Sequence, residues 1–399
     1  MLRILARGGG ARNVRIHRDE TPRTPAPYGG ATARPLPSYA DTMLSLPLLL
    51  LALAAAPADT PAVQVRVAPG LVWIEEGASQ YLNFDFVVRN GGGDTLDVAR
   101  IELSVYDEAG GLQLRKLVNE NGPSPSVQTL APARSFAPGA EGLIFNPFFE
   151  FPREVRLARL RYDVELRPRG ENRTSSVVTV MVEPRPYQPK TALAMPVHGR
   201  VLVWDGHDFY SHHRRWDFGH PVLRENCITS NAGRYSYDFV LLGADDSLHT
   251  GDGKAHAQWH GYGADVRAPA AGRVVAASGE HPDDGNFDIS RLCASELAMY
   301  GNHVVIDHGN GEMSVLAHLQ QGSVSVRAGD EVGQGQTVAR VGSSGSSLFP
   351  HLHYQLVTGV EHGAEGVPSY FPGIRIRRGS GWVAAPNGQV DTGDIIDAR

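Results

Sequence analysis

The chain has 399 residues, of which 20% are charged, and its formal net charge is −6. This length allows two or three domains of ordinary size, each able to bury a core of its own. The charge is mild and no long basic block occurs downstream of the N-terminus, so nucleic acid is excluded as an expected partner. The 45 glycines and 27 prolines, together with the absence of heptad patterns, favour an all-β chain with many turns.

The first 58 residues have the composition of a leader and an export signal. Residues 1–42 contain seven Arg and no Lys and show no apolar periodicity. They indicate a disordered leader or, if Met43 is the true start in place of Met1, untranslated sequence. Residues 44–56 form an apolar run that is too short for a membrane span of about 20 residues. The run ends in small residues, which is typical of a signal-peptide cleavage site.

We therefore expect a signal peptide at 43–58 and a secreted product. The mature chain would be located in the periplasm, the cell envelope or the extracellular space, with no transmembrane span.

Short segments with period-two alternation fill residues 63–183. Examples are residues 81–88, 99–106, 160–166 and 176–182, and glycine-rich turns separate them. Alternation of this kind predicts half-buried antiparallel strands. About seven strands over this length fit an immunoglobulin-like β-sandwich. Residues 63–183 show no catalytic cluster, so we expect a spacer or a module that binds a protein partner.

A proline-rich linker at 184–192 separates this sandwich from a second predicted domain at 193–360. Six further strands are predicted in the second domain, at 234–242, 272–278, 303–307, 312–318, 337–341 and 351–357. Residues 280–300 resemble an insertion with a short helix at 290–298. Residues 361–399 form a C-terminal extension.

The two cysteines of the chain, Cys227 and Cys293, both lie in the second domain. Neither has a partner at Cys-x-x-Cys spacing, so metal ligation by thiolates is disfavoured. Export would allow a disulfide between them, and the sequence leaves open whether that bridge forms.

Histidines are concentrated in the second domain: 15 of the 16 lie between His198 and His362. His351 and His353 are two residues apart in a predicted strand, so their side chains point to the same side. Two imidazoles that reach one point are the usual beginning of a zinc centre. His318 lies in another strand-like segment, and Asp238 could supply a carboxylate ligand.

The second domain resembles the lysostaphin-type zinc metallopeptidases, a family of peptidoglycan endopeptidases. The resemblance rests on the segments 262–275, 301–309, 315–319 and 326–335, and on Gly-Ser-Ser-Gly at 342–345 followed by His351-Leu352-His353. It implies an antiparallel β-fold with a narrow groove and one zinc ion per chain on its floor.

The resemblance also implies the roles of four residues. Asp238 and His353 would be metal ligands. His351 would act as a general base on a zinc-bound water and then protonate the leaving amine. His318 would hydrogen-bond this water or stabilise the oxyanion.

One position departs from the family pattern. Members of the family commonly have His four residues before the Asp ligand, but this chain has Arg234, which cannot bind a metal. Either the first ligand is lost or it comes from farther upstream. We favour His213, ahead of His212 and then His220. Because adjacent residues on a strand face opposite sides, only one of His212 and His213 should bind.

These residues predict an exported zinc metalloendopeptidase, a hydrolase that cleaves peptide bonds, and the expected substrate is the peptidoglycan of the cell wall. The alternative is a catalytically inactive domain that binds peptidoglycan or regulates a partner hydrolase, which loss of the local histidine would suit. A secreted protease that acts on other proteins is a third interpretation.

Overall fold

The structure is a computed structural model, and it describes residues 62–170 and 174–398. The predicted leader (1–42) and signal peptide (43–58) lie outside the described residues. Thr60–Arg399 form one compact unit in which strands predominate and helices are short, which confirms the all-β prediction. Among the described residues, no helix combines the length and the apolar composition that crossing a membrane requires.

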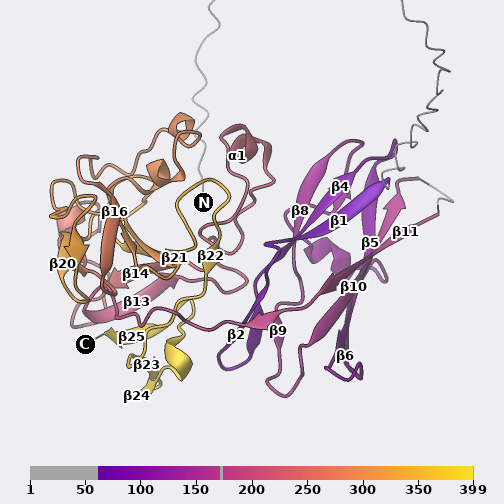
Figure 1. Cartoon of the computed structure of the whole chain (residues 1–399), viewed down its shortest axis with the longest axis horizontal. Helices are drawn as coiled ribbons and strands as arrows, with labels where there is room; N and C mark the ends of the chain where they lie inside the picture. The colour runs from indigo at the N-terminus through magenta and orange to yellow at the C-terminus, as the bar shows by residue number, and fades with distance from the viewer. Residues whose placement is uncertain (1–61, 171–173, 399) are drawn as a thin grey trace, which may run out of the picture. The chain divides into compact units, whose positions relative to one another are not determined.

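Residues 63–186, which we call the N-terminal β region, are drawn in indigo to magenta in Figure 1. Their elements are β1 (Val63–Ala68), β2 (Trp73–Glu76), β3 (Gln80–Leu82), β4 (Asp85–Asn90), β5 (Leu96–Tyr106), β6 (Leu112–Asn119), the 3₁₀ helix η1 (Ser126–Thr129), β7 (Ser135–Phe136), β8 (Glu141–Phe145), β9 (Glu150–Phe151), β10 (Arg159–Pro168), β11 (Ser176–Val182) and β12 (Arg185–Pro186).

Three sheets make up this region. One has the order β1-β4-β8, the second has the order β11-β10-β5-β6, and the third has the order β12-β2-β3-β9. Buried side chains from β4 and β8 and from β5 and β10 belong to a single hydrophobic core, which includes Phe86, Ile101 and Leu160. The alternation that predicted these strands is thus the alternation between core and solvent. The immunoglobulin-like class of sandwich stays a prediction.

Residues 199–398 form the C-terminal β region. Its elements are β13 (Gly199–Asp205), α1 (Pro221–Glu225), β14 (Tyr237–Leu241), η2 (His256–Gln258), β15 (Asp265–Arg267), β16 (Gly272–Ser278), η3 (Ile289–Arg291), η4 (Glu296–Tyr300), β17 (His303–Asp307), β18 (Met313–Ala317), β19 (Glu331–Val332), β20 (Thr337–Arg340), β21 (Leu352–Val357), β22 (Gly366–Val367), β23 (Arg375–Arg378), β24 (Gly381–Ala384), η5 (Pro386–Gly388) and β25 (Ile395–Ala398).

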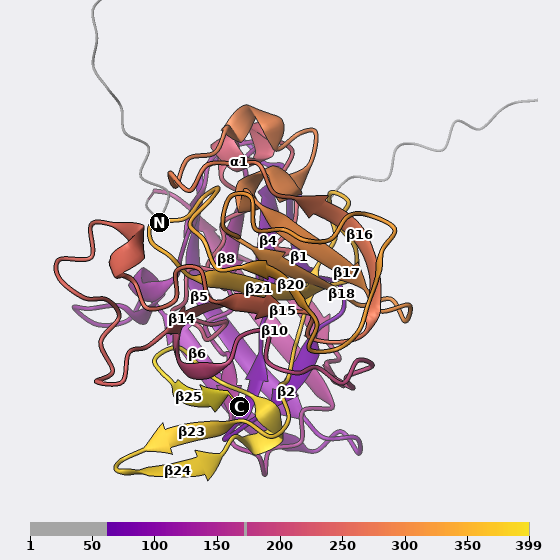
Figure 2. The same ribbon diagram turned by 90° about the vertical axis from the view of Figure 1, so that its left-hand side faces the viewer.

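Most of these strands belong to one 11-stranded sheet with the order β19-β16-β17-β18-β21-β14-β13-β25-β23-β24, with β22 paired to β21. Every pairing in the sheet is antiparallel. Figure 2 shows β25, β23 and β24 together at one end of it. Four strands of the sheet, β22 to β25, come from the segment after residue 360. The central strands β18, β21 and β14 position the site described below.

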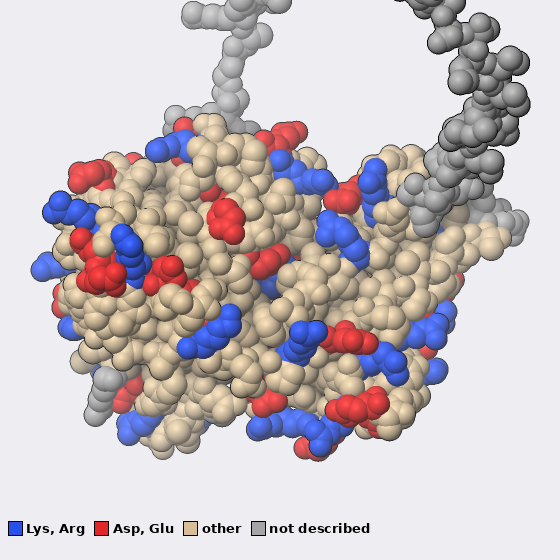
Figure 3. All heavy atoms as spheres, in the orientation of Figure 1, with Lys and Arg blue, Asp and Glu red and all other residues tan. Residues whose placement is uncertain are grey.

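The connections over the sheet contain the disulfide between Cys227 and Cys293. This bridge joins the end of α1 to the segment after η3, so it holds the long connection between β16 and β17. A single helix is predicted there at 290–298, but the structure has the two short 3₁₀ helices η3 and η4 instead. Acidic and basic side chains are interspersed over the face shown in Figure 3.

Candidate metal centre

The centre lies on adjacent strands in the middle of the large sheet. Asp238 in β14 is directly opposite His353 in β21, and His353 is opposite Ala317 at the end of β18. On the other side of β14, Asp205 at the end of β13 is opposite Asp238, after a bulge in the pairing. The register of the sheet thus places a row of polar side chains across its strands, and each of them is buried, with 5–7% exposure.

His318 follows β18 and has a left-handed backbone conformation, with φ of +57°. Such a conformation costs about 1–3 kcal/mol outside glycine, so surrounding contacts must hold it. The His318 N–H donates to the Tyr300 carbonyl. Its Nδ1 donates to the Ser344 carbonyl at 2.8 Å. These contacts bring the His318 ring to 4.9 Å from that of His351, between ring centroids.

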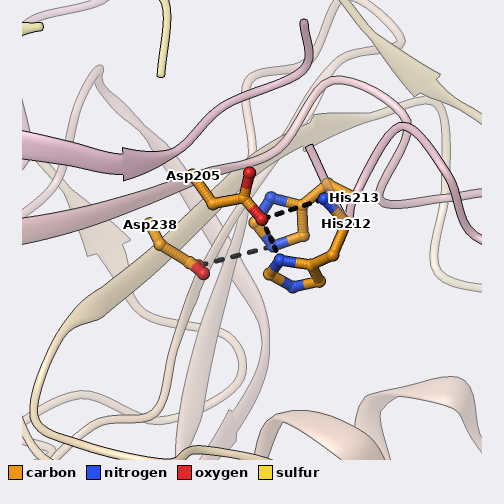
Figure 4. A group of neighbouring side chains, drawn as sticks. All are labelled: Asp205, His212, His213 and Asp238. Atoms are coloured by element: carbon orange, nitrogen blue, oxygen red, sulfur yellow. Dashed lines mark hydrogen bonds and ion pairs between the residues drawn. The ribbon is translucent and has the colours of Figure 1, made fainter. Parts of the chain in front are cut away.

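His213 reaches the centre from the turn that follows β13 (Figure 4). Its Nε2 lies 3.4 Å from Asp238 Oδ1, and its Nδ1 lies 3.3 Å from the Gly206 carbonyl. The rings of His213 and His353 are 4.9 Å apart. The first-choice residue for the distant ligand is therefore next to the other predicted ligands.

In each of these four histidines, one ring nitrogen donates a hydrogen bond to a neighbouring oxygen. Gly206 and Ser344 accept from His213 and His318 as described, and the Phe349 carbonyl accepts from His351 Nδ1 at 2.8 Å. Gln355 Oε1 accepts from His353 Nε2 at 2.9 Å. In a neutral imidazole this leaves the other nitrogen as a lone-pair donor.

The free lone pairs converge on one carboxylate. Asp238 Oδ1 lies 3.0 Å from His353 Nδ1 and 3.4 Å from both His213 Nε2 and His351 Nε2. With the tautomers described above, the facing atoms are all acceptors, and a cation among them would offset their mutual repulsion. The donor set therefore fits a metal ion that prefers nitrogen and carboxylate ligands, such as zinc.

The protonation states agree with this fit. Burial opposes ionisation of Asp238, but the contacts with His351 and His353 help to hold the pKa of its carboxyl well below the usual range. Burial likewise opposes protonation of His351, but the Asp238 carboxylate raises the pKa of that ring. Burial also lowers the pKa of His213 and of His318 well below that of a free histidine, so both rings are neutral. A carboxylate and neutral imidazoles are the forms that bind metals.

His212, the second choice for the distant ligand, lies at the edge of the same group. Suitable atoms of Asp205, His212, His213 and Asp238 all lie within 4.8 Å of one another. The N–H of His212 donates to Asp205 Oδ2 at 3.0 Å, and its Nδ1 also contacts that oxygen. Its side chain is 49% exposed, against 7% for His213.

His212 and His213 lie in a turn and not on a strand, so their rings do not face opposite sides and are only 4.0 Å apart. The strand argument for choosing between them was therefore wrong. The third choice, His220, caps α1, where its Nδ1 accepts from the Val222 N–H.

Arg234 occupies the place where the family commonly has its first ligand, and its side chain is fully buried. Its guanidinium turns to Asp85 in the N-terminal β region, at 2.7 Å from Oδ2. Its Nε lies 3.3 Å from Glu365.

Sequence reasoning missed three residues around the centre. Gln355 Oε1 accepts from Tyr300 and Ser236 as well as from His353, and the Tyr300 ring stacks on His353 at 5.2 Å. Gln355 is two residues after His353 on one strand, a spacing that predicts a shared face. Asp205 and Tyr300 carry no comparable signal in the sequence.

Residues 258–364 match peptidase family M23, a segment that contains His318, His351 and His353. The chain is 42% identical over 57 residues to the peptidoglycan DD-endopeptidase ShyA of Vibrio cholerae. The matched segment covers 14% of this chain and 13% of ShyA. It is 37% identical over 112 residues to ShyC of the same organism, also a peptidoglycan DD-endopeptidase, covering 28% of this chain and 22% of ShyC.

The murein hydrolase activator EnvC of Escherichia coli is 36% identical over 99 residues, covering 24% of this chain and 23% of EnvC. The chain thus spans less than a quarter of the length of each of these relatives. The family match and the resemblance noted in the sequence agree on the same segment. Residues 258–364 therefore form a domain of peptidase family M23.

Proposed function

We propose that this chain is an exported zinc metalloendopeptidase that hydrolyses peptide bonds in peptidoglycan. The observation that carries the proposal is the convergence of imidazole lone pairs on the Asp238 carboxylate. The substrate class is supported by two relatives that are named as peptidoglycan DD-endopeptidases. Export is supported by the disulfide between Cys227 and Cys293, because disulfides persist in oxidising compartments.

Three atoms would hold one zinc ion: His213 Nε2, Asp238 Oδ1 and His353 Nδ1. Two neutral imidazoles and one carboxylate leave a net charge of +1 and an open coordination position, as in catalytic zinc sites. Zinc in such a site supplies a Lewis acid that lowers the pKa of water to about 7 and polarises a carbonyl. Gln355 would orient His353 through the bond to its Nε2, a support that commonly accompanies a histidine ligand.

His351 would serve as the general base and then the general acid. The bond from its Nδ1 to the Phe349 carbonyl makes Nε2 the basic atom, and Nε2 is the atom that faces Asp238. In the proposed reaction this nitrogen takes a proton from the attacking water and returns it to the leaving amine.

His318 would position the attacking water. Its Nδ1–H is used by the Ser344 carbonyl, and its neutral ring therefore offers Nε2 only as an acceptor. An acceptor can orient water by taking one of its hydrogens, but it cannot donate to an oxyanion. Of the two roles that the resemblance allowed for His318, the structure supports water positioning.

The test is zinc content and peptidoglycan cleavage by the full chain. We expect about one zinc per chain by elemental analysis, and release of soluble peptides from purified peptidoglycan, measured by mass spectrometry. Asp238→Asn and His353→Ala should abolish both, whereas His351→Ala should abolish cleavage and leave zinc in place. A wild-type chain without zinc would contradict the proposal.

The similarity to EnvC, a murein hydrolase activator, favours a second function, in which the chain acts on peptidoglycan through another hydrolase. A chain that acts only through another hydrolase needs no general base of its own, so His351 would have no proton to transfer. Zinc binding without any cleavage of peptidoglycan or short peptides would favour this second function over the first.

A further inference from the structure

The turn that carries His213 is held by residues of the N-terminal β region. Resting on the zinc function proposed above, we propose that this region is part of the metal centre. Asp85 would be a positioning residue that sets the place of His213 through the neighbouring Arg214, while Arg234 binds the other oxygen of the same carboxylate.

Arg214 directly follows His213 and is bonded twice to β4 and the residue before it. Its guanidinium donates to Asp85 Oδ1 and to the Phe84 carbonyl, both at 2.6 Å. The Arg214 and Asp85 side chains are 1% and 0% exposed. A charge-assisted bond between groups this deeply buried allows little movement of the backbone that carries them. His213 is therefore anchored from its C-terminal side.

Arg234 uses the second oxygen of the same carboxylate. It lies 2.7 Å from Asp85 Oδ2, and its own carbonyl accepts from Asn83 at 3.0 Å. Between the two arginines, Asn231 donates to the His213 carbonyl at 2.9 Å. One aspartate thus connects the His213 turn to the segment that enters β14.

A second contact holds the N-terminal side of the turn. His213 Nδ1 donates to the carbonyl of Gly206, and the next residue, His207, lies 2.8 Å from Glu75 of β2. Within the turn, Phe209 stacks on Phe149 of the N-terminal β region at 4.2 Å between ring centroids. Both ends of the turn and its middle are therefore held by residues 63–186.

The replacement of the local histidine by Arg234 has a physical explanation in this arrangement. A histidine ligand four residues before Asp238, on the same stretch of backbone, would need no support from another region of the chain. A ligand from a separate turn must be held by its surroundings, and Arg234 provides part of that support by binding Asp85. Neither guanidinium can lose its proton. Removal of the Asp85 charge would take the carboxylate from Arg214 and leave Arg234 with Glu365 at 3.3 Å, which would force the turn to move.

The test compares zinc affinity in full-length variants. Asp85→Asn keeps the shape of the side chain and removes its charge. We expect it to weaken zinc binding about 10–100-fold, the usual effect of losing a group that supports a ligand. Cobalt(II) bound to this variant should show a visible spectrum shifted towards that of His213→Ala, because the spectrum reports the ligands.

Two matched controls separate this role from general destabilisation. Asp97→Asn removes a carboxylate whose partner, Arg169, lies within the N-terminal β region. Leu103→Ala opens a cavity in the core of that region. Leu103→Ala should lower the melting temperature, and both controls should keep wild-type zinc affinity and the wild-type cobalt spectrum.

The double variant Asp85→Asn/His213→Ala completes the cycle. If Asp85 acts through His213, this variant binds zinc as weakly as His213→Ala alone. Additive losses, or an Asp85→Asn chain with wild-type affinity and spectrum, would overturn the inference while leaving the zinc function intact. A wild-type chain that binds no zinc would overturn both. If Asp85→Asn does not fold, Arg214→Lys takes its place, with the same expected and contradicting results.

Discussion

The tautomer of each histidine in the metal centre is set by the oxygen atom that accepts a hydrogen bond from one of its two ring nitrogens. Main-chain carbonyls fix His213, His318 and His351, whereas a side-chain amide fixes His353. A main-chain partner cannot be changed by substitution, so the tautomers of the first three are properties of the fold. This distinction lets the roles of the residues be tested one at a time.

The choice between His213 and His212 can be decided by a paired substitution. His213→Ala should reduce zinc from about one per chain to near zero after dialysis, because it removes one of three ligands. His212→Ala should keep the metal, since the His212 ring is half exposed and directed at Asp205. Elemental analysis of the two variants gives the answer. The reverse pattern would make His212 the ligand.

At this scale the sequence indicated which side chains lie together, and their roles as ligands or catalytic groups stay predictions. His318, His351, His353 and Asp238 follow from strand periodicity and the family resemblance, and the structure brings them together. The first ligand stayed open among three histidines, because the turn that carries it depends on contacts with residues such as Asp85, 129 positions away from Arg214. No local pattern reports a contact of that range.

The elements themselves were easier to predict than the contacts between them. Residues 272–278 and 303–307 were predicted as strands and are β16 and β17 with the same limits. Both have the alternation and flanking turns that follow from burial of a sheet. The connection from β13 to β14 has neither, and its conformation is set by long-range contacts.

The backbone at Gly345 packs directly against the backbone at Gly301 near the metal centre. Replacement of Gly345 by a larger residue should therefore destabilise the protein. Its φ is +71°, and an added Cβ would lie 2.4 Å from the Gly301 nitrogen. Strain at the backbone alone is worth about 1–3 kcal/mol. Gly345→Ala should therefore lower the melting temperature and the peptidase activity, because the adjacent Ser344 carbonyl holds His318.

Gly333→Ala is the control for this substitution, since an added Cβ at Gly333 meets no atom within 4 Å. Thermal unfolding followed by circular dichroism compares the two. Equal melting temperatures would show that the Gly301–Gly345 contact contributes nothing to stability.

The 3₁₀ helix η4 contains a buried carboxyl that should make stability depend on pH. Burial raises the pKa of Glu296 from 4.5 to about 7, and the residue is 8% exposed. A raised pKa means that the folded state resists ionisation, so the stability contributed by this group is fully present below pH 4.5 and is lost as the pH rises to about 7. Each pKa unit is worth about 1.4 kcal/mol, so the full loss is about 3 kcal/mol.

Glu296→Gln should remove this dependence. The variant is expected to be more stable than the wild type at pH 8 and nearly equal to it at pH 4, as measured by urea unfolding at both values. Glu361→Gln, at an exposed position, is the control. A Gln variant that gains nothing at pH 8 would show that the Glu296 carboxylate is accommodated without cost.

For the whole molecule, the strands after residue 360 matter as much as those before it. β25 pairs with β13, the strand that ends at Asp205, and β22 pairs with β21, which carries His353. The predicted domain limits, including 193–360, stay predictions. The sheet itself extends beyond residue 360. Composition and periodicity locate strands and cannot show which distant strands pair, because pairing is decided by the register of the assembled sheet.

The disulfide between Cys227 and Cys293 allows a test of whether the protein works in an oxidising compartment. Cys227 and Cys293 are 66 residues apart in sequence, and closing a loop of that length in the unfolded chain stabilises the native state by about 4 kcal/mol. The double substitution of both cysteines by serine should therefore lower the urea midpoint markedly. A reducing agent should lower the wild-type midpoint to the same value and leave the variant unchanged, since Cys293 is exposed to solvent. A wild-type midpoint that is indifferent to reduction would show that the bridge does not stabilise the protein, and would remove the support that it gives to export.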